Sequence, residues 1–218
     1  MPKKRVMAYI DGYNVYHGIV DLIKGPSGKP NSRLNYLKWL DLRSLIQAFT
    51  LKSKEEIVKV YYFSAYATWK PEALSRHRAY VAALESTGIT VIMGSFKRKE
   101  ATCKNCKVQY FKHEEKETDV NIALKLLHDA MDGSFDKAII VTGDSDLKPA
   151  IREVKEFNSS LTIVSLIPSK RFFASEDLKS VCDSASRFGI EHIEKSLFPE
   201  TITTSDGRII GCPEAYRR

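Results

Sequence analysis

The sequence contains no apolar run that approaches the roughly 20 residues needed to cross a bilayer. Its first residues, MPKKRVMAYIDGYN, reach a strand-like segment too soon to include the apolar part of a signal peptide. We therefore expect a cytoplasmic protein that makes no membrane contact.

Cysteine is scarce, with four in 218 residues. Inside the cell such thiols stay reduced or bind metal rather than form disulfides. Cys103 and Cys106 have the CxxC spacing of half a zinc site, but a closed site needs four ligands and no second CxxC pair follows. His113, Cys182, Cys212 or a second chain would have to complete it. The sequence thus leaves both a Zn²⁺ half-site and a metal-free pair open.

Motifs of several enzyme classes are also missing. There is no Ser-His-Asp order, no GxSxG turn and no GxxxxGK[ST] loop, which argues against serine hydrolases and nucleoside triphosphatases. A phosphatase of the haloacid-dehalogenase type needs a second aspartate two residues after Asp11, where Tyr13 stands. That phosphatase remains as a disfavoured alternative.

The charge balance favours a polyanionic partner. Lysine and arginine number 34 against 27 aspartates and glutamates, which leaves a formal charge of +7. Hydrophobic residues make up 43% of the chain, enough for one good core. We predict one domain over residues 1–195 and a C-terminal tail over 196–218.

Apolar segments alternate with helical patterns along the chain. Segments rich in Val, Ile and aromatics predict buried strands at 6–10, 57–65, 89–96, 137–143 and 161–168. Helical periodicity predicts helices at 36–50, 71–87, 117–131 and 147–157, and a Gly, Pro and Ser-rich loop occupies 24–33. This order predicts an α/β fold with a three-layer, doubly wound, mainly parallel sheet.

A lysine-rich insert at 97–116 interrupts that alternation. Its segments SFKRKEAT and KVQYFKHE predict the arms of a β-hairpin with the CxxC pair near its tip. Tyr110 and Phe111 stand among basic residues, a composition that suits single-stranded RNA through phosphate attraction and base stacking. A solvated hairpin with one aromatic packed inward explains it equally well. The basic residues are Lys97, Arg98, Lys99, Lys104, Lys107, Lys112 and Lys116.

Four aspartates fall where ligands gather in an open parallel sheet, beyond the carboxyl ends of the strands. Asp11 ends the first strand, Asp144 and Asp146 follow the fourth, and Asp119 opens the helix before it. Each alone could cap a helix or complete a turn. Together they would repel one another without a cation, so they predict a site for Mg²⁺ or Mn²⁺.

Three blocks, YIDGYNVY, EKETDVNIALKLL and IIVTGDSDLKPAI, resemble the NYN family of PIN-like nucleases, in particular its LabA-like branch. The resemblance covers residues 5 to 167. It implies a PIN/Rossmann-like sheet in strand order 3-2-1-4-5 and an Mg²⁺- or Mn²⁺-dependent ribonuclease. Two departures from the family pattern, ETD before the second block's helix and Leu147 in place of an aromatic, remove none of the four carboxylates.

By matching position, the resemblance implies a metal site of Asp11, Asp119, Asp144 and Asp146, with Asn14 and Lys116 as further catalytic residues. From the mechanism, we expect Asp11 and Asp144 to bind metal directly and Asp119 and Asp146 to act through water or a second ion. Products would then carry 5′-phosphates. Substrate contacts are expected from Asn14, Thr142, Ser145, Lys112, Lys116 and, in the loop PSKRFF, from Lys170 and Arg171.

The partner expected from these features is RNA, in single-stranded form. A homodimer is compatible with the resemblance, although no residue of the sequence identifies a dimer surface. In a second interpretation the protein has the same fold but does not cleave RNA. It is then a non-catalytic RNA-binding or regulatory module.

Overall fold

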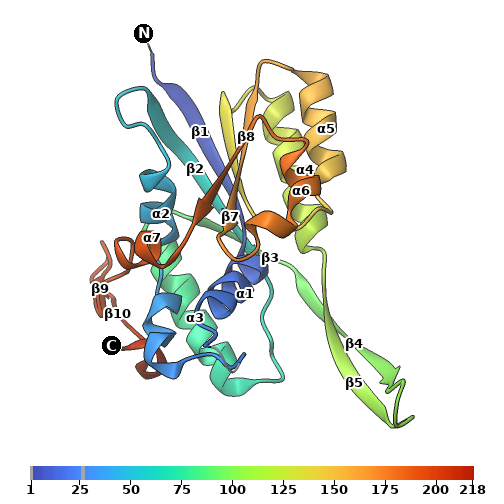
Figure 1. Cartoon of the computed structure of the whole chain (residues 1–218). Coiled ribbons are helices and arrows are strands. Elements are labelled where there is room, and N and C mark those ends of the chain that lie inside the picture. Colours follow the sequence, from blue (N-terminus) through green and yellow to red (C-terminus); the bar gives the residue numbers. More distant parts are fainter. Residues whose placement is uncertain (1, 26–27) are drawn as a thin grey trace.

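The computed structural model describes residues 2–25 and 28–218, so part of the predicted loop at 24–33 lies outside the described residues. Its centre is a six-stranded sheet in the order β3-β2-β1-β6-β7-β8 (Figure 1). All neighbouring strands run parallel. The strands are β1 (Lys4–Asp11), β2 (Glu55–Ser64), β3 (Thr90–Met93), β6 (Lys137–Val141), β7 (Thr162–Pro168) and β8 (Ser184–Phe188).

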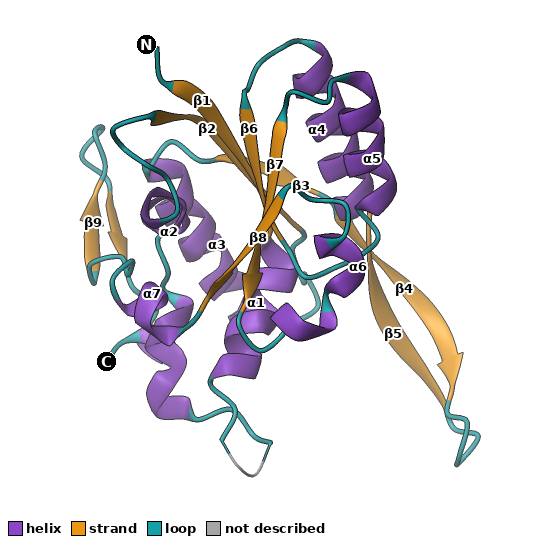
Figure 2. Cartoon of the chain, turned by 45° about the horizontal axis from the view of Figure 1, so that its top comes forward, coloured by secondary structure: helices purple, strands orange, loops and turns teal. Residues whose placement is uncertain are grey.

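Helices cover both faces of this sheet (Figure 2). One side carries α1 (Gly12–Leu22), α2 (Leu42–Ala48), α3 (Pro71–Ser86), α7 (Ile190–Glu194) and the 3₁₀ helix η1 (Ser32–Lys38). The other carries α4 (Thr118–Met131), α5 (Lys148–Phe157) and the short α6 (Glu176–Lys179), preceded by η2 (Phe172–Ala174). None of the helices in the described part of the chain is both long and apolar enough to traverse a bilayer.

Strand β1 shows why the core has two halves. Successive strand side chains point to opposite faces. Ala8 and Ile10 accordingly pack in the core under α1, α2 and α3. Met7 and Tyr9 pack in the second core, under α4 and α5. A strand buried on both faces reads as a continuous apolar run, which is how the sequence predicted it.

The predicted α/β class and the order 3-2-1-4-5 of the first five strands are confirmed. Four details differ. Strand β8 and helix α1 were not predicted, and the helix expected at 36–50 is divided into η1 and α2. The strand expected at 89–96 ends at Met93, because the chain turns at Gly94 into the hairpin.

The basic insert forms the predicted hairpin from β4 (Ser95–Thr102) and β5 (Gln109–Lys116). The strands pair antiparallel from Ser95 opposite Lys116 to Thr102 opposite Gln109. Figures 1 and 2 both show the hairpin projecting away from the body of the molecule. At its root a Cβ on Gly94 would lie 2.6 Å from the Lys116 carbonyl oxygen, so this close approach requires glycine.

The C-terminal residues pack against the first core rather than extend into solvent. They form β9 (Thr201–Thr203), β10 (Ile209–Gly211) and the 3₁₀ helix η3 (Glu214–Tyr216). Phe198 and Cys212 are buried in that core. The indole Nε1 of Trp39 also donates a 2.9 Å hydrogen bond to the carbonyl of Pro199.

Candidate active site

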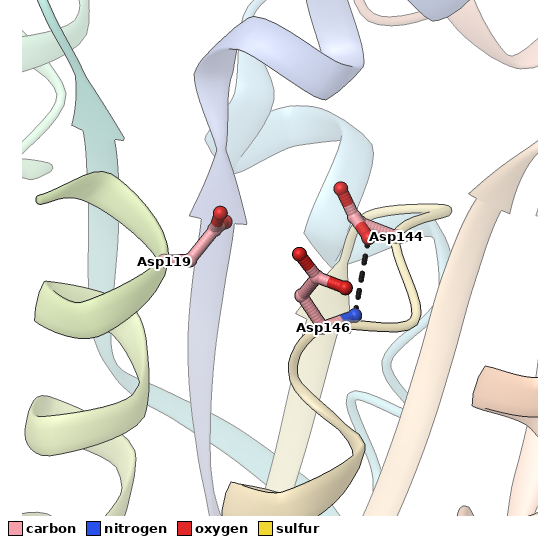
Figure 3. Close-up of side chains that lie close together, drawn as sticks. All are labelled: Asp119, Asp144 and Asp146. Carbon is pink, nitrogen blue, oxygen red and sulfur yellow. Dashed lines mark hydrogen bonds between the residues drawn. The ribbon is translucent and has the colours of Figure 1, made fainter. Parts of the chain in front are cut away.

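Three aspartates meet beyond the carboxyl ends of the central strands. Asp119 lies on the first turn of α4, and Asp144 and Asp146 lie in the loop after β6. One carboxylate oxygen from each lies within 4.8 Å of the others. Figure 3 shows the three side chains on either side of a shared space, with the amide of Asp146 bonded to the Asp144 carboxylate at 3.1 Å.

The loop that carries Asp144 and Asp146 is held by hydrogen bonds that are buried or partly buried. Thr142 Oγ1 accepts from the Asp144 amide at 3.1 Å and donates to Asp11 Oδ2 at 3.0 Å. Asn14 Oδ1 accepts from the Gly143 amide at 2.9 Å. These bonds tie the end of β6 to the end of β1 and the start of α1, so the position of Asp144 depends on both elements.

Asp11 lies deeper than the three clustered aspartates. It caps α1 by accepting from the Asn14 amide at 2.9 Å, and it is 6% exposed. Burial raises the pKa of Asp11 to about 7, although its hydrogen bonds from Asn14 and Thr142 favour the ionised form. It lines the same cavity, of about 480 Å³, as Asp119 and Asp144. The compact carboxylate group is therefore Asp119, Asp144 and Asp146, with Asp11 at its floor.

Negative charge is concentrated in this cavity. Partial burial, followed by the charges of Asp144 and Asp146, raises the pKa of Asp119. Glu115, which the sequence interpretation missed, lines the cavity as well, and burial raises its pKa. Its position four residues before Asp119 was the available signal. Like charges held this close cost energy that a divalent cation offsets, and the oxygen-only donor set suits Mg²⁺ or Mn²⁺.

Two predicted cations border the carboxylates. Lys116 and Arg171 both line the cavity. Lys116 forms a 3.2 Å ion pair with Glu114 on the hairpin. The Arg171 guanidinium contacts Asp21 Oδ2 through Nε at 3.0 Å and Nη2 at 2.8 Å. A cavity lined by both carboxylates and cations suits a phosphate group that contacts a metal ion and the protein together.

Other predicted substrate contacts lie elsewhere. Thr142 is fully buried, so its expected contact with substrate is wrong and its hydroxyl holds the loop instead. Lys112 pairs with Glu114 on the hairpin, and Lys170 lies 3.5 Å from the Lys24 carbonyl oxygen. Ser145 is exposed in the loop between the two aspartates. Of these four, none is among the residues that line the acidic cavity.

Both cysteines of the CxxC pair are free and lie at the hairpin tip. Across residues 2–25 and 28–218, the aspartate cluster is the sole group of three or more His, Cys, Asp or Glu side chains arranged to hold a metal. His113, Cys182 and Cys212 thus do not close a zinc site with Cys103 and Cys106 within one chain.

The chain resembles known proteins in sequence and in fold. The NYN domain family model matches residues 5–189. The chain is 28% identical over 185 residues to 6-hydroxy-3-succinoylpyridine 3-monooxygenase of Pseudomonas putida, covering 69% of this chain and 55% of that protein. It thus spans just over half the length of this relative. A crystal structure of a Vibrio parahaemolyticus protein of unknown function shares the fold, with a TM-score of 0.59, 17% identity and coverage of 90% of this chain and 97% of that one.

Proposed function

Because the chain belongs to the NYN domain family, within the PIN-like nuclease superfamily, we propose that it is a metal-dependent ribonuclease that hydrolyses RNA phosphodiester bonds. The observation that carries the proposal is the cluster of Asp119, Asp144 and Asp146, whose carboxylate oxygens lie within 4.8 Å of one another. Carboxylates in this number, beside two cations, suit phosphodiester chemistry better than hydroxylation of an aromatic ring.

The three clustered aspartates would hold Mg²⁺ or Mn²⁺. When bound, such an ion makes a water nucleophilic near neutral pH and offsets the charge that develops on the phosphate and the leaving oxygen. The geometry favours a division of roles different from the one expected from sequence, since Asp119 and Asp146 cluster with Asp144 while Asp11 lies beneath them. Asp11 would position the loop through Thr142 and cap α1.

The remaining residues would bind and orient the substrate phosphate. Arg171 is held by two contacts to Asp21, so its guanidinium is fixed before substrate arrives. Lys116 adds a second positive charge at the cavity. Asn14 fixes the Gly143 amide and keeps the aspartate loop at its distance from α1. Water, rather than the ribose 2′-hydroxyl, would attack, and the products would carry 5′-phosphate and 3′-hydroxyl ends.

The test compares the cleavage of end-labelled single-stranded RNA by wild type and by the double variant Asp144→Asn, Asp146→Asn. Each protein is assayed with Mn²⁺ and with EDTA. We expect Mn²⁺-dependent cleavage by wild type and a loss of at least about 100-fold in the variant, because two of the three clustered carboxylates lose their charge. The control is the double variant Asp132→Asn, Asp206→Asn, which removes the same number of negative charges from exposed sites. It should cleave RNA like wild type.

Other outcomes would favour other functions. RNA retained by wild type without metal-dependent cleavage would favour a non-catalytic RNA-binding module. Phosphate released from small phosphomonoesters would favour the phosphatase. The name of the Pseudomonas putida relative describes oxygenation of 6-hydroxy-3-succinoylpyridine, so a parallel assay with that compound, molecular oxygen and a reductant checks this chain for it. Its conversion, without RNA cleavage, would overturn the ribonuclease proposal.

A further inference from the structure

A second cavity, of about 700 Å³, lies beside the acidic one. It is formed by α1, by α3 with the loop before it, and by the root of the β4–β5 hairpin. Aromatic side chains make up a large part of its lining. We call it the aromatic groove and define it by Tyr13, Tyr16, Trp69, Phe96, Phe111 and His113.

The groove is continuous with the acidic cavity. Tyr13 and His17, on the exposed side of the first turns of α1, line both. A chain whose phosphate lies at the carboxylates can therefore place its next flat group against Tyr13 without leaving the protein surface. The basic side chains of Lys70 and Arg76 also line the groove, so its entrance attracts a negatively charged strand.

The aromatic rings are arranged before any ligand binds. Trp69 stacks on His113 with ring centroids 3.6 Å apart and planes 8° apart, and it meets Phe96 edge-on at 4.9 Å. Tyr13 packs on His17 at 4.3 Å. Even so, 37% of Trp69 and 48% of Tyr13 remain exposed, which leaves ring surface for a ligand. Rigid, partly exposed rings bind a flat group at low entropic cost.

The groove is also weakly charged inside. Burial lowers the pKa of His77 to about 4, and burial lowers the pKa of His17 as well. Both imidazoles are therefore neutral at pH 7. Aromatic rings lined up with Lys70 and Arg76 match one part of a nucleic acid strand, the base, while the carboxylates of the acidic cavity match another, the phosphate with its metal ion.

We propose that the aromatic groove binds unpaired nucleobases of the same RNA strand whose backbone is cleaved at the acidic cavity. The proposal rests on the ribonuclease function and names its substrate as single-stranded. Bases in a duplex are paired and stacked on one another, so they cannot stack on Trp69 or Tyr13. Stacking on aromatic rings tolerates any base. The groove should therefore distinguish single-stranded from duplex RNA rather than one base sequence from another.

Tryptophan fluorescence tests the proposal, because the sequence contains only two tryptophans and Trp39 is 3% exposed. The protein is titrated in EDTA with single-stranded RNA, with duplex RNA and with an abasic ribose-phosphate oligomer of equal length. We expect quenching by single-stranded RNA alone. Trp69→Ala should weaken the binding of single-stranded RNA by about 5- to 150-fold, the range for losing one stacked base, as measured by the anisotropy of labelled RNA because this variant lacks the reporting tryptophan. Phe157→Ala, which removes an exposed aromatic from the end of α5, should not.

Equal quenching by the abasic oligomer, or unchanged affinity of Trp69→Ala, would overturn the proposal. Quenching by free nucleosides or 6-hydroxy-3-succinoylpyridine as strong as by RNA would overturn it too, and would assign the groove to a small aromatic ligand. Because the titration contains no metal, it is independent of cleavage. If the protein binds RNA through its bases but never cleaves it, the proposed ribonuclease function is refuted, whereas the proposal that the groove binds bases stands.

A different observation concerns the hairpin tip. The turn there is closed by hydrogen bonds from the Cys103 amide to the Val108 carbonyl at 2.9 Å and from the Lys107 amide to the Cys103 carbonyl at 3.0 Å. Lys107 has a left-handed φ of 58°, which turns the chain directly after Cys106.

We also infer that the tips of two copies of this chain bind one Zn²⁺ through Cys103 and Cys106 of each. A structural zinc site needs four ligands, and one tip supplies two. The hairpin carries its tip away from the body, where a second tip can reach it (Figure 2). Four thiolates around Zn²⁺ leave a charge of −2, which Lys104 and Lys107 of both tips offset.

Zinc analysis and light scattering after size-exclusion chromatography test this site on protein supplied with Zn²⁺. We expect one Zn²⁺ per two chains and a dimer that a chelator converts to monomer. Cys103→Ser, Cys106→Ser should be a zinc-free monomer, whereas Cys182→Ser, away from the tip, should behave as wild type. Zinc on a monomer, or a dimer that keeps its mass without zinc, would overturn the inference.

Discussion

At the scale of single residues, the site depends on hydrogen bonds made behind the reactive surface. Thr142 is fully buried and joins Asp11 to the amide of Asp144. Its side chain therefore fixes the end of β1 relative to the loop that follows β6. The sequence placed a hydroxyl residue here but could not show that it faces inward, because β6 is buried on both sides and gives no alternating pattern.

Thr142→Val tests this role, since it keeps the shape of the side chain and removes the hydroxyl. The Asp11 carboxylate and the Asp144 amide each lose a buried partner. We expect the free energy of unfolding to fall by about 1–3 kcal/mol, measured by urea denaturation, and cleavage to slow. Thr142→Ser retains the hydroxyl and should recover most of both losses. Wild-type stability and cleavage in the valine variant would contradict the role.

Asp183 gives the fold a dependence on pH. Partial burial opposes its ionisation, but the Ile163 amide at 2.7 Å and the Lys155 ammonium at 2.8 Å outweigh burial and lower the pKa of Asp183 below its ordinary 3.8. A carboxyl group whose pKa is lower in the folded state than in the unfolded state stabilises the fold at pH values above its unfolded-state pKa. That contribution is lost as the pH falls through the folded-state pKa.

Asp183→Asn should therefore lower the free energy of unfolding by about 1 kcal/mol at pH 7, a value reduced for the solvent exposure of the ion pair. The difference from wild type should shrink as pH falls below 4, because wild type then loses the same charge. Urea denaturation at pH 7 and at pH 3 measures both. A difference that is constant with pH would show that the Asp183 charge contributes nothing.

At the scale of elements, propensity and packing explain which parts were predicted. The apolar runs of β1, β2, β6 and β7 were recognised because both faces of each strand are buried. Helix α1 was missed because GYNVYHGIVDL starts with glycine and is rich in residues that form helices poorly. It is stabilised by a local cap, the Asp11 carboxylate, and by a tertiary contact at Gly18, where a Cβ would lie 2.4 Å from Pro168.

Strand β8 was missed for a related reason. Its sequence, SASRF, is short, polar and mostly small, with only Phe188 fully buried. Five backbone positions pair it with β7 at the sheet edge. An edge strand is stabilised mainly by backbone hydrogen bonds to the neighbouring strand rather than by the packing of its own side chains. A single sequence therefore contains little signal for it.

The hairpin should be a separable RNA-binding element. Replacing residues 99–112 by an Asn-Gly turn joins Arg98 to His113, which already face each other, and keeps the site residues after position 114. Since the removed residues are mostly exposed, we expect little change in thermal midpoint. Affinity for single-stranded RNA should fall.

The salt dependence of binding identifies the cause. The deletion removes four lysines and one glutamate. The slope of log affinity against log salt should therefore become shallower, by about 0.7 for each RNA phosphate that the shortened hairpin no longer neutralises. Unchanged slope and affinity would mean that the basic hairpin does not contact RNA.

At the scale of the whole molecule, the C-terminal segment packs against the same core as one face of the sheet. Phe198 packs on Trp39 at 5.5 Å between centroids and is 8% exposed. The Leu40 and Leu197 backbones form an antiparallel bridge. The sequence prediction of a tail from 196 rested on its turn residues, which describe local conformation and not where the intervening apolar residues pack.

Phe198→Ala should therefore destabilise the entire chain. We expect about 3–5 kcal/mol less free energy of unfolding, in one cooperative transition, because a buried ring leaves a cavity. Phe157→Ala, 55% exposed, should change it by less than about 0.5 kcal/mol. Urea denaturation followed by circular dichroism compares the two. A Phe198→Ala protein as stable as wild type would mean that the segment is independent.

The central claim is that Asp119, Asp144 and Asp146 form one metal-dependent centre at which water cleaves RNA. The most direct measurement is cleavage of single-stranded RNA with Mn²⁺ in ¹⁸O-labelled water, with the product ends analysed by mass spectrometry. The account predicts 5′-phosphate ends that each carry one ¹⁸O, and no cleavage by Asp119→Asn, Asp144→Asn, Asp146→Asn. Products ending in 2′,3′-cyclic phosphate, or equal cleavage by the triple variant, would contradict it.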